Sequence, residues 1–443
     1  MALFTKEEAL RYHSCARKGK LEVVPCKPFR NQKDLSCAYS PGVAEACREI
    51  HADPSKVFEY TNRGNNVAVV SNGTAVLGLG NIGPKAGKPV MEGKGFLFKI
   101  FADIDVYDLN INAAKPEQVI EFCKMLEPSV GGINLEDIKA PECFEIEQTL
   151  IEELEIPVFH DDQHGTAIVS AAGLLNACEI TGKKISDLRV VVSGAGAAAI
   201  ACSKLYVAMG IDPANIAMFD TKGHINKSRT GLHSTKAYFG DVQKTEYASL
   251  GDAMKGADVF LGLSVKGAVS PDMVKGMAKD PVIFAMANPD PEIPYPDAKA
   301  ARPDAIMGTG RSDFPNQVNN VSGFPFIFRG ALDAGSRKIN EEMKMAAAKA
   351  IAALAKEPVP SEICDMYGVK ELKLGLDYVM PKALDFRMLE WEAPAVAKAA
   401  MDTGVATKKL DLEQYKKDLR KRMDDAHARM KQFLATYDLS ELG

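Results

Sequence analysis

The sequence has little of what a membrane or secreted protein needs. No apolar run reaches the roughly 18 residues of a membrane span, so we expect no membrane partner. Residues 1–8 lack the basic and apolar regions of a signal peptide. The nine cysteines are scattered singly, without a CxxC pair, which disfavours a zinc site or a disulfide framework. We therefore expect a cytoplasmic protein whose thiols are reduced and serve mainly as small buried side chains.

Strong charge of either sign is also missing. The formal net charge is only −5, so we expect no nucleic-acid partner. What is present is the composition of a soluble globular protein, with 46% hydrophobic and 26% charged residues. A chain of 443 residues suggests two or three domains at about 150 residues each. We place them at residues 1–160, 161–390 and 391–443.

The clearest motif lies in the second of these domains. A predicted strand over residues 187–193 runs into the GxGxxA turn Gly194–Ala199, and a predicted helix follows. The next strand, residues 216–220, ends in Asp220, 24 positions after Gly196. The first glycine permits a tight turn, the second lets the backbone approach a pyrophosphate, and the helix N-terminus favours phosphate. The pattern predicts a Rossmann-type domain, a doubly wound parallel sheet that binds a dinucleotide.

Two cofactors fit this motif. Asp220 is placed to accept hydrogen bonds from ribose hydroxyls, which favours NAD. Lys222, Lys227 and Arg229 follow closely and could bind a 2′-phosphate, so NADP stays open.

Polar residues also end later strands of this domain. Ser264 follows the run 257–263, Asn288 follows the run 282–286, and Asn320 closes a glycine-rich loop. Such side chains suit contacts with a nicotinamide or a carboxylate. Asn is also a common turn residue, so a purely structural role is the alternative.

An earlier glycine motif, Gly78–Gly83, matches GxGxxG but is followed by Pro84 and Pro89. We predict that these prolines exclude a long helix, which makes the motif a glycine-rich loop of the first domain. Just before it, two β-branched runs between residues 67 and 79 flank Asn72-Gly73, which predicts a β-hairpin.

Two acidic pairs follow consecutive predicted strands. Glu136 and Asp137 end one strand, and Asp161 and Asp162 end the next. Open α/β sheets bind ligands at such strand ends, and four carboxylates suit Mg²⁺ or Mn²⁺ if the strands are neighbours. The alternative is that Asp162 or Thr166 simply caps the Ala-rich helix that we expect here.

Two residues are candidates for proton transfer. Lys94 lies between two glycines in an expected loop, where burial or a nearby cation could lower its pKa enough to make it a base. Tyr39 lies in a Ser-Pro-Gly turn before a predicted helix and could aim its hydroxyl into a cleft. The alternatives are a solvated loop lysine and a packing tyrosine with a wet tip.

After residue 328 the chain is predicted to be mostly helical, and it ends in a tail with apolar residues at helical spacing. We expect this stripe to dock on the body of the protein or on a second subunit. Its members are Leu412, Tyr415, Leu419, Met423, Met430 and Phe433.

With these pieces placed, the chain resembles the malic enzymes, in particular the shorter bacterial type. Seven motifs in the family's order carry the resemblance: SCAYSPGVAEAC (36–47), GKPVMEGKGFLFK (87–99), NLEDIKAP (134–141), FHDDQHGTA (159–167), GAGAAAI (194–200), FAMANPDPE (284–292) and GTGRSDFPNQVNN (308–320). A looser likeness extends from about Tyr12 to Asp385. We expect no phosphotransacetylase-like extension, and the last 40 or so residues match nothing that we can place.

The resemblance implies oxidative decarboxylation of L-malate to pyruvate and CO₂, with NAD or NADP and with Mg²⁺ or Mn²⁺, in a homodimer or larger homo-oligomer. It also implies an α/β fold with an N-terminal substrate and metal domain, a Rossmann domain and a helical C-terminal tail. In one departure, Asp103 stands where related sequences more often carry Gly, and we expect it to alter the floor of the cleft.

The resemblance also implies roles for single residues. Tyr39 corresponds to the general acid, Lys94 to the general base and Asp161 to the acid that supports the lysine. The implied metal ligands are Glu136, Asp137 and Asp162, and the implied substrate contacts are Tyr39, Lys94, Asn288 and Asn320. We place the dinucleotide on Thr166, Gly194, Ala195, Gly196, Ala197, Ala198, Asp220, Ser264 and Asn288.

Two alternatives stay open. A dinucleotide-binding sensor or scaffold would bind the cofactor without turnover, with structural acidic pairs. A metal-free amino-acid dehydrogenase shares the domain order and uses a lysine, but four strand-end carboxylates would repel a substrate carboxylate unless a cation intervened.

Overall fold

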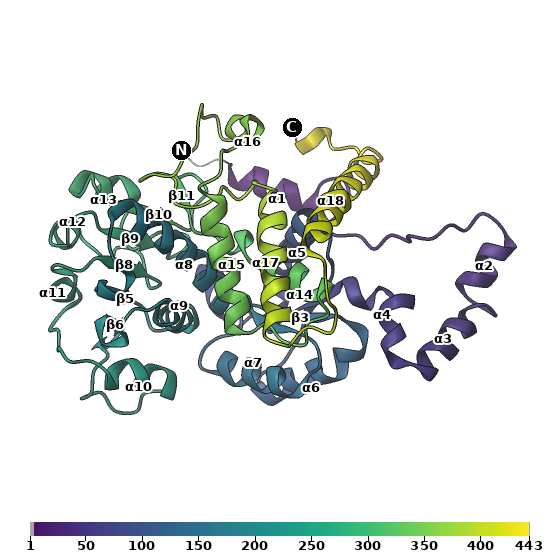
Figure 1. The fold of residues 1–443 in the computed structure, drawn as a ribbon, viewed down its shortest axis with the longest axis horizontal. Helices are drawn as coiled ribbons and strands as arrows, with labels where there is room; N and C mark the ends of the chain where they lie inside the picture. The colour runs from purple at the N-terminus through teal and green to yellow at the C-terminus, as the bar shows by residue number, and fades with distance from the viewer. Residues whose placement is uncertain (1–3, 443) are drawn as a thin grey trace.

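Two mainly parallel β-sheets and a layer of helices between them form the body of the protein in the computed structural model, which describes residues 4–442 (Figure 1). Helix α8 (Asp161–Thr181) leads from the last strand of the first sheet into the second domain. Its sides are buried nearly all round, as expected for a helix in the middle of a molecule. No helix in the described part of the chain is long and apolar enough to cross a membrane.

The first sheet has four parallel strands in the order β2-β1-β3-β4. Its inner strands are buried and mostly apolar, because helices cover a parallel sheet. The strands are β1 (Asn66–Ser71), β2 (Asp105–Asn110), β3 (Gly132–Leu135) and β4 (Val158–His160). The connecting helices are α5 (Gly83–Ala102), α6 (Pro116–Leu126) and α7 (Glu142–Glu153).

The predicted hairpin at Asn72-Gly73 is wrong. Strand β1 has parallel partners on both sides, so neither edge is free for a second antiparallel strand. The chain after the turn instead crosses to the end of β3, where the amides of Thr74 and Ala75 both donate to the carbonyl of Asp137. The turn therefore closes over the carboxyl edge of the sheet.

The prediction that prolines exclude a long helix after Gly83 is also wrong. Helix α5 begins at Gly83, holds Pro84 in its first turn, and continues through Pro89. A first-turn proline is tolerated because its missing amide would have no partner there, and packing of the buried face overrides the cost of the second. Lys94 therefore lies on a buried helix face rather than in a loop.

The second sheet has seven strands in the order β11-β10-β9-β8-β5-β6-β7, parallel except for the pair β6 and β7. The order reverses beside β5, which confirms the predicted doubly wound sheet. The strands are β5 (Val190–Ser193), β6 (Ile216–Asp220), β7 (Gly223–His224), β8 (Val259–Gly262), β9 (Val282–Ala285), β10 (Ile306–Thr309) and β11 (Asn316–Gln317). The covering helices are α9 (Ala197–Ala208), α10 (Ser234–Asp241), α11 (Leu250–Met254), α12 (Pro271–Lys275) and α13 (Tyr295–Ala301).

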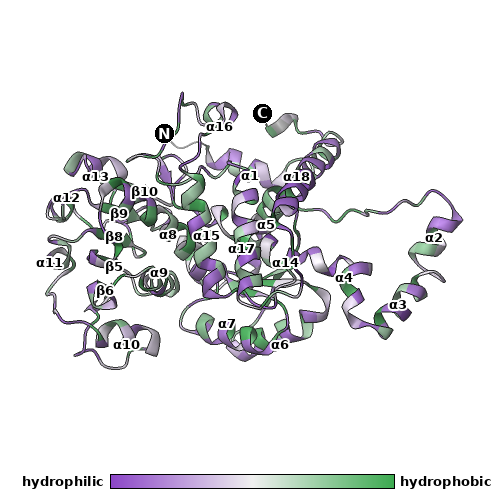
Figure 2. Cartoon of the chain, viewed as in Figure 1, coloured by the Kyte–Doolittle hydropathy of each residue, from purple (hydrophilic) through white to green (hydrophobic). Residues whose placement is uncertain are grey.

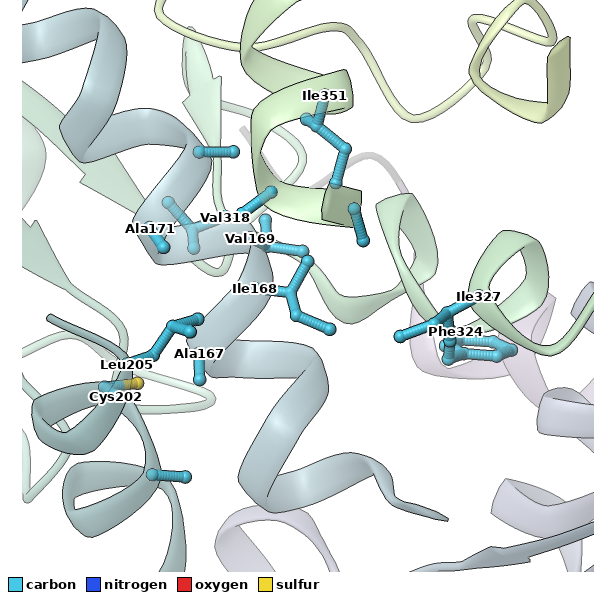
Figure 3. Packing of buried hydrophobic residues seen from close by; sticks show 14 of the residues in the cluster. Ala167, Ile168, Val169, Ala171, Cys202, Leu205, Val318, Phe324, Ile327 and Ile351 are labelled. Carbon is cyan, nitrogen blue, oxygen red and sulfur yellow. The ribbon is translucent and has the colours of Figure 1, made fainter. Parts of the chain in front are cut away.

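One hydrophobic core runs through both sheets and the later helices. Figure 3 shows its centre, where Ile168 and Val169 of α8 lie between α9 and the residues Phe324, Ile327 and Ile351. The later helices are α14 (Phe324–Asp333), α15 (Glu341–Leu354), α16 (Ser361–Met366), α17 (Met388–Asp402) and α18 (Leu412–Leu434). This shared core fixes the two sheets relative to each other.

The tail docks on its own body. Tyr415, Leu419 and Met423 of α18 are buried, and the hydroxyl of Tyr415 donates to Asp333 of α14 at 2.7 Å. Near the end of the tail, the hydroxyl of Tyr437 donates to Glu22. Three of the six residues of the predicted stripe therefore pack within the chain.

Asp103 is not on the floor of the cleft, which corrects our expectation. It ends α5 with a φ of 48°, the left-handed region that favours glycine. Its carboxylate pairs with Lys99 at 2.7 Å and with Arg429 of α18 at 3.3 Å. The acid therefore joins the tail to the first domain.

Residues 23–61, which we call the arm, project from the body (Figure 1). The arm holds an extended segment and the helices α2 (Gln32–Ala38), α3 (Val43–Ala52) and α4 (Val57–Tyr60). None of the residues in these helices is buried. Figure 2 shows hydrophobic residues on α2 and α3 beside hydrophilic ones. Helix α1 (Lys6–Ser14) precedes the arm.

Candidate active site

The two acidic pairs meet because β3 and β4 are neighbours. Leu135 is paired with His160, so the residues that follow each strand leave the same edge of the sheet. The carboxylate of Asp162 accepts a hydrogen bond from the amide of Asp137 at 2.7 Å. One carboxylate oxygen from each of Glu136, Asp137 and Asp162 lies within 4.8 Å of the others. The structure thus brings the three predicted metal ligands into one cluster.

The alternative of a simple helix cap does not hold. The N-cap of α8 is His160, and no side chain caps the helix. Asp161 and Asp162 instead occupy the first turn, where the helix dipole favours negative charge. The hydroxyl of Thr166 donates to Asn320 rather than to the helix end.

Lys94 reaches this cluster from α5. Its ammonium nitrogen lies 2.6 Å from Asp161 and 2.9 Å from Glu136, and it sits 4.1 Å from the centre of the Phe324 ring. Burial lowers the pKa of Lys94, but the charges and hydrogen bonds of the two acids outweigh burial, so the pKa lies above its ordinary value. From the sequence we expected that burial or a nearby cation could lower this pKa. The direction is opposite because the immediate neighbours are acids, not cations.

The cluster carries more negative charge than Lys94 can offset. Burial raises the pKa of Glu136 well above its ordinary value, and the charges of Asp162, Asp161 and Asp137 add to the effect although Lys94 opposes it. Burial also raises the pKa of Asp162. Crowded, buried carboxylate oxygens are the ligand set that a hard divalent cation prefers.

Asn320 joins the cluster from the second domain. Its amide nitrogen donates to Asp161 at 3.0 Å, and its amide oxygen accepts from Thr166 at 3.0 Å. This contact is possible because Gly165 has no side chain: a Cβ there would lie 2.0 Å from Asp161 and 3.1 Å from Asn320. Two predicted ligand-binding residues, Thr166 and Asn320, therefore lie together beside Asp161, the acid that pairs with Lys94.

The dinucleotide motif lies at the end of β5. Gly194 has a φ of 110°, and a Cβ on it would lie 2.3 Å from the carbonyl of Leu263. Gly196 is the N-cap of α9 and has open space where a Cβ would be. Ala195 lies between the two glycines, and Ala197 and Ala198 open the helix. The loop therefore presents backbone at a helix N-terminus, as phosphate binding requires.

Asp220, at the end of β6, pairs with Arg229. Two nitrogens of the guanidinium lie 2.8 Å and 3.1 Å from the two carboxylate oxygens. Burial raises the pKa of Asp220, but the hydrogen bonds from Arg229 and from the Lys222 amide, together with the nearby positive charges, outweigh burial and lower it. Asp220 is the predicted ribose acceptor, and Arg229 is one of the cations that we assigned to a 2′-phosphate. The two side chains thus lie side by side.

Ser264 and Asn288 follow β8 and β9. The Ser264 hydroxyl lies 2.9 Å from that of Ser193, and its amide donates to the buried Glu292 at 2.7 Å. Asn288 lies against the first domain, since a Cβ on Gly78 would lie 2.3 Å from its carbonyl. The glycine motif that we excluded as a dinucleotide site therefore serves a close contact between the domains.

Sequence reasoning missed Glu147. This acid of α7 is buried and accepts hydrogen bonds from the amide of His160 at 2.9 Å and from Gln163 at 3.0 Å. It also bonds to His164, which contacts Lys344 of α15. Glu147 thus braces the start of α8. An acid at the buried spacing of an amphipathic helix was the available signal.

Tyr39 is not brought to the site within one chain. It lies at the turn between α2 and α3 on the arm, and it is 74% exposed.

Comparisons with known proteins show the family of the chain. The profile "Malic enzyme, N-terminal domain" matches residues 18–151, and "Malic enzyme, NAD binding domain" matches residues 163–367. An NADP-dependent malic enzyme of Haemophilus influenzae is 56% identical over 91% of this chain and 53% of its own length. One of Halomonas elongata is 54% identical over 90% of this chain and 94% of its own length. An NAD-dependent malic enzyme of Rhizobium meliloti is 54% identical over 92% and 53%.

The chain spans about half the length of the Haemophilus and Rhizobium relatives. Among solved structures, the malic enzyme from Pyrococcus horikoshii has a TM-score of 0.87 and 40% identity, with coverage of 97% of this chain and 98% of that one. The malic enzyme of Entamoeba histolytica has a TM-score of 0.88 and 34% identity, with coverage of 98% and 92%. The chain belongs to the malic enzyme family.

Proposed function

We propose that the chain oxidises and decarboxylates L-malate to pyruvate and CO₂, reduces NAD⁺ or NADP⁺, and requires a divalent cation. One observation carries the proposal: Lys94 is buried against Asp161 and Glu136, beside the cluster completed by Asp137 and Asp162. A buried base next to a carboxylate cluster at a sheet's carboxyl edge suits oxidation of a hydroxy acid.

The residues present fit Mg²⁺ or Mn²⁺. Glu136, Asp137 and Asp162 offer hard oxygen ligands within 4.8 Å of one another, and burial and mutual repulsion disfavour their joint ionisation without a cation. When bound, such a cation supplies Lewis-acid stabilisation of negative charge that develops on the substrate oxygen.

Lys94 would remove the hydroxyl proton of malate as hydride leaves for the nicotinamide. Its raised pKa keeps it protonated while Glu136 and Asp161 carry full charge. If Glu136 shared its charge with a bound cation, one of the two charges that raise this pKa would be offset, and the lysine would move towards the neutral form that a base needs. Asp161, which Asn320 also contacts, would hold the lysine in place.

Substrate and dinucleotide would bind between the two domains. The amides of Asn320 and Asn288 suit a malate carboxylate, and the phenol of Tyr39 suits the acid that protonates C3 after CO₂ leaves. The loop Gly194–Ala198 would hold the pyrophosphate, with Ser264 near the nicotinamide. We infer that either NAD or NADP can bind, because Asp220 and Arg229 supply an acceptor and a cation side by side.

Nine free cysteines support a cytoplasmic location.

Initial-rate measurements test this function. With L-malate and Mn²⁺, absorbance of reduced dinucleotide should rise with NAD⁺ or NADP⁺, and pyruvate should form in equal amount. Chelation should abolish the rate, and added Mn²⁺ or Mg²⁺ should restore it. Dinucleotide binding without turnover would instead favour a sensor, and metal-independent oxidation of an amino acid would favour a dehydrogenase of that class.

A further inference from the structure

Glu292, which follows strand β9, is a buried acid that no cation neutralises. Its exposed fraction is 0%. In the part of the chain that the structure describes, no lysine, arginine or histidine forms an ion pair with Glu292. The nearest acid along the chain differs, because Asp290 pairs with Lys266 at 3.0 Å on the surface. An uncompensated buried charge is costly, so we expect Glu292 to serve more than the stability of the fold.

Hydrogen bonds favour the charged form of Glu292. One carboxylate oxygen accepts from the amide of Ser264 at 2.7 Å and from the Ser264 hydroxyl at 3.2 Å. The other oxygen accepts from the amide of Ala287 at 3.1 Å. Burial raises the pKa of Glu292, but the hydrogen bonds that the carboxylate accepts oppose the rise. Because an N–H group can only donate, both oxygens meet partners of the ionised form, and we expect a negative charge at neutral pH.

The carboxylate of Glu292 joins two loops at the carboxyl edge of the second sheet. Ser264 follows β8 and Ala287 follows β9, and these two strands are paired. A Cβ on Gly262, the last residue of β8, would lie 2.5 Å from the carboxyl carbon of Glu292, so the acid fits only beside a glycine. The Ser264 hydroxyl also lies 2.9 Å from that of Ser193, the last residue of β5. Glu292 is thus linked to the ends of three adjacent strands.

The order of the strands places the nicotinamide half of a dinucleotide on this side of the sheet. The loop Gly194–Ala198 after β5 is the proposed pyrophosphate site, and Asp220 at the end of β6 is the proposed ribose acceptor. Strand β6 lies on one side of β5, while β8 and β9 lie on the other. A dinucleotide that crosses the switch point with its adenosine half over β6 has its nicotinamide half over β8 and β9. The ring would therefore bind at the strand ends that Glu292 joins.

The two redox forms of the nicotinamide ring differ in charge. The oxidised ring carries one positive charge, and the hydride that it accepts converts it into a neutral dihydropyridine. A buried negative charge attracts the oxidised ring and not the reduced one, and the attraction is strong because little water screens it. The pyrophosphate and both riboses are the same in the two forms. A charge at Glu292 would therefore distinguish the forms by the ring alone.

We propose that the buried carboxylate of Glu292 makes the nicotinamide site prefer the oxidised dinucleotide over the reduced one. The inference rests on the dinucleotide-binding part of the proposed function. The preference helps the reduced dinucleotide to leave after hydride transfer. It also lowers the reduction potential of the bound dinucleotide, by about 30 mV for a tenfold difference between the two dissociation constants.

Binding of both forms of the dinucleotide to a Glu292→Gln protein tests the preference. Titration calorimetry, with Mg²⁺ present and no malate, gives the dissociation constants of NAD⁺ and NADH, or of NADP⁺ and NADPH if only these bind. Gln keeps the size of the side chain and removes its charge, so the ratio of the oxidised to the reduced constant should rise by about tenfold. A purely structural role would weaken both forms alike, so an unchanged ratio would overturn the proposal.

Asp290→Asn is the matched control. It removes the same charge from the same loop, but this carboxylate is partly exposed and paired with Lys266, where solvent and the cation already offset it. The ratio should therefore stay within about twofold of the wild-type value. A rise in Asp290→Asn as large as that in Glu292→Gln would show that the charge of the whole loop sets the preference, and it would overturn the assignment to Glu292.

A neutral analogue tests the same charge in the wild-type protein, so the result does not depend on the folding of a variant. In benzamide adenine dinucleotide, an uncharged benzamide ring replaces the oxidised nicotinamide ring and keeps its flat shape. The wild-type protein should bind the oxidised dinucleotide about tenfold more tightly than the matching benzamide analogue. Glu292→Gln should bind the two with nearly equal affinity. Equal affinity in the wild-type protein would contradict the proposal.

These measurements need no turnover, so they separate the inference from the proposed function. A raised ratio in Glu292→Gln, together with no oxidation of malate, would reject the proposed reaction and keep the role of Glu292. Malate oxidation with an unchanged ratio would do the reverse. A wild-type protein that bound neither form of the dinucleotide would overturn both.

Discussion

The body and the arm differ in how much they bury their candidate catalytic groups. On the body, the buried Lys94 and Asp161 and the half-buried Asn320 form a set of hydrogen bonds drawn from both domains. On the arm, Tyr39 lies in a tight turn, but its side chain is exposed. Burial lets the body perturb pKa values, because desolvated charges act strongly on one another. The arm can bring a group from elsewhere, because it is not part of any core. The chain thus holds groups in fixed positions on the body and an exposed group on the arm.

The largest expected effect comes from removing the base on the body. Lys94→Ala should reduce turnover by about 10²- to 10⁴-fold, because no other base lies in its place. The loop Gly194–Ala198 lies apart from this substitution, so dinucleotide affinity should stay near that of the wild type. Stopped-flow rates and titration calorimetry would measure the two quantities. Wild-type turnover in this variant would rule out the base assignment.

A smaller effect is expected from loosening the tip of the arm. Gly42→Ala forces a Cβ against the Ser36 carbonyl, so the turn must shift and Tyr39 must move. We expect turnover to fall by about tenfold or more, since small misplacements of a reacting group are costly. The melting temperature should hardly change, because the arm adds nothing to the core.

Gly64→Ala is the matched control, since its nearest contact is an ordinary 3.5 Å to Phe58. A Gly42→Ala protein that melts much earlier than the wild type would show that the arm belongs to the body after all.

The smallest expected effect on turnover comes from Glu392, a fully buried acid of α17. Burial raises the pKa of Glu392 well above its ordinary value, so it is neutral in the folded state. Because the folded-state pKa is raised, the contribution of Glu392 to the free energy of unfolding is fully present below the unfolded pKa, near 4.3. This contribution falls by roughly 1.4 kcal/mol per pH unit as pH rises towards the folded pKa.

Glu392→Gln should therefore flatten the pH dependence of unfolding and leave turnover near the wild-type value. Urea unfolding at pH 5 and pH 8 measures the change, with the exposed Glu117→Gln as control. Equal pH dependence in wild type and Glu392→Gln would argue against a neutral acid. At Glu392 the predicted change is in stability and not in activity. At Gly42 the predicted change is in activity and not in stability. The two results together would sharpen the contrast between body and arm.

Short sequence patterns were enough to predict those parts of the fold whose elements are adjacent in the sequence. The strand, glycine turn and helix around Gly194 are adjacent in sequence, so their geometry could be predicted. The two acidic pairs could be placed at strand ends, although their meeting depends on the pairing of β3 with β4. The metal cluster was thus a prediction conditional on one contact between strands.

Other features depend on packing that no short segment reveals. The second proline of α5 is tolerated because the helix buries its face, and the hairpin at Asn72 fails because both edges of β1 are taken. The bond between Asn320 and Asp161 joins residues 159 positions apart. The exposure of Tyr39 could not be foreseen either, because a turn motif does not say where its tip points.

The hydrogen bond between Tyr437 and Glu22 has a consequence for synthesis on the ribosome. These residues are 415 positions apart, so the arm emerges long before the tail residue that bonds to its root has been translated. Until then the nascent arm lacks this fastening and cannot adopt its final direction. The root of the arm should therefore take its final direction only after the tail has been translated.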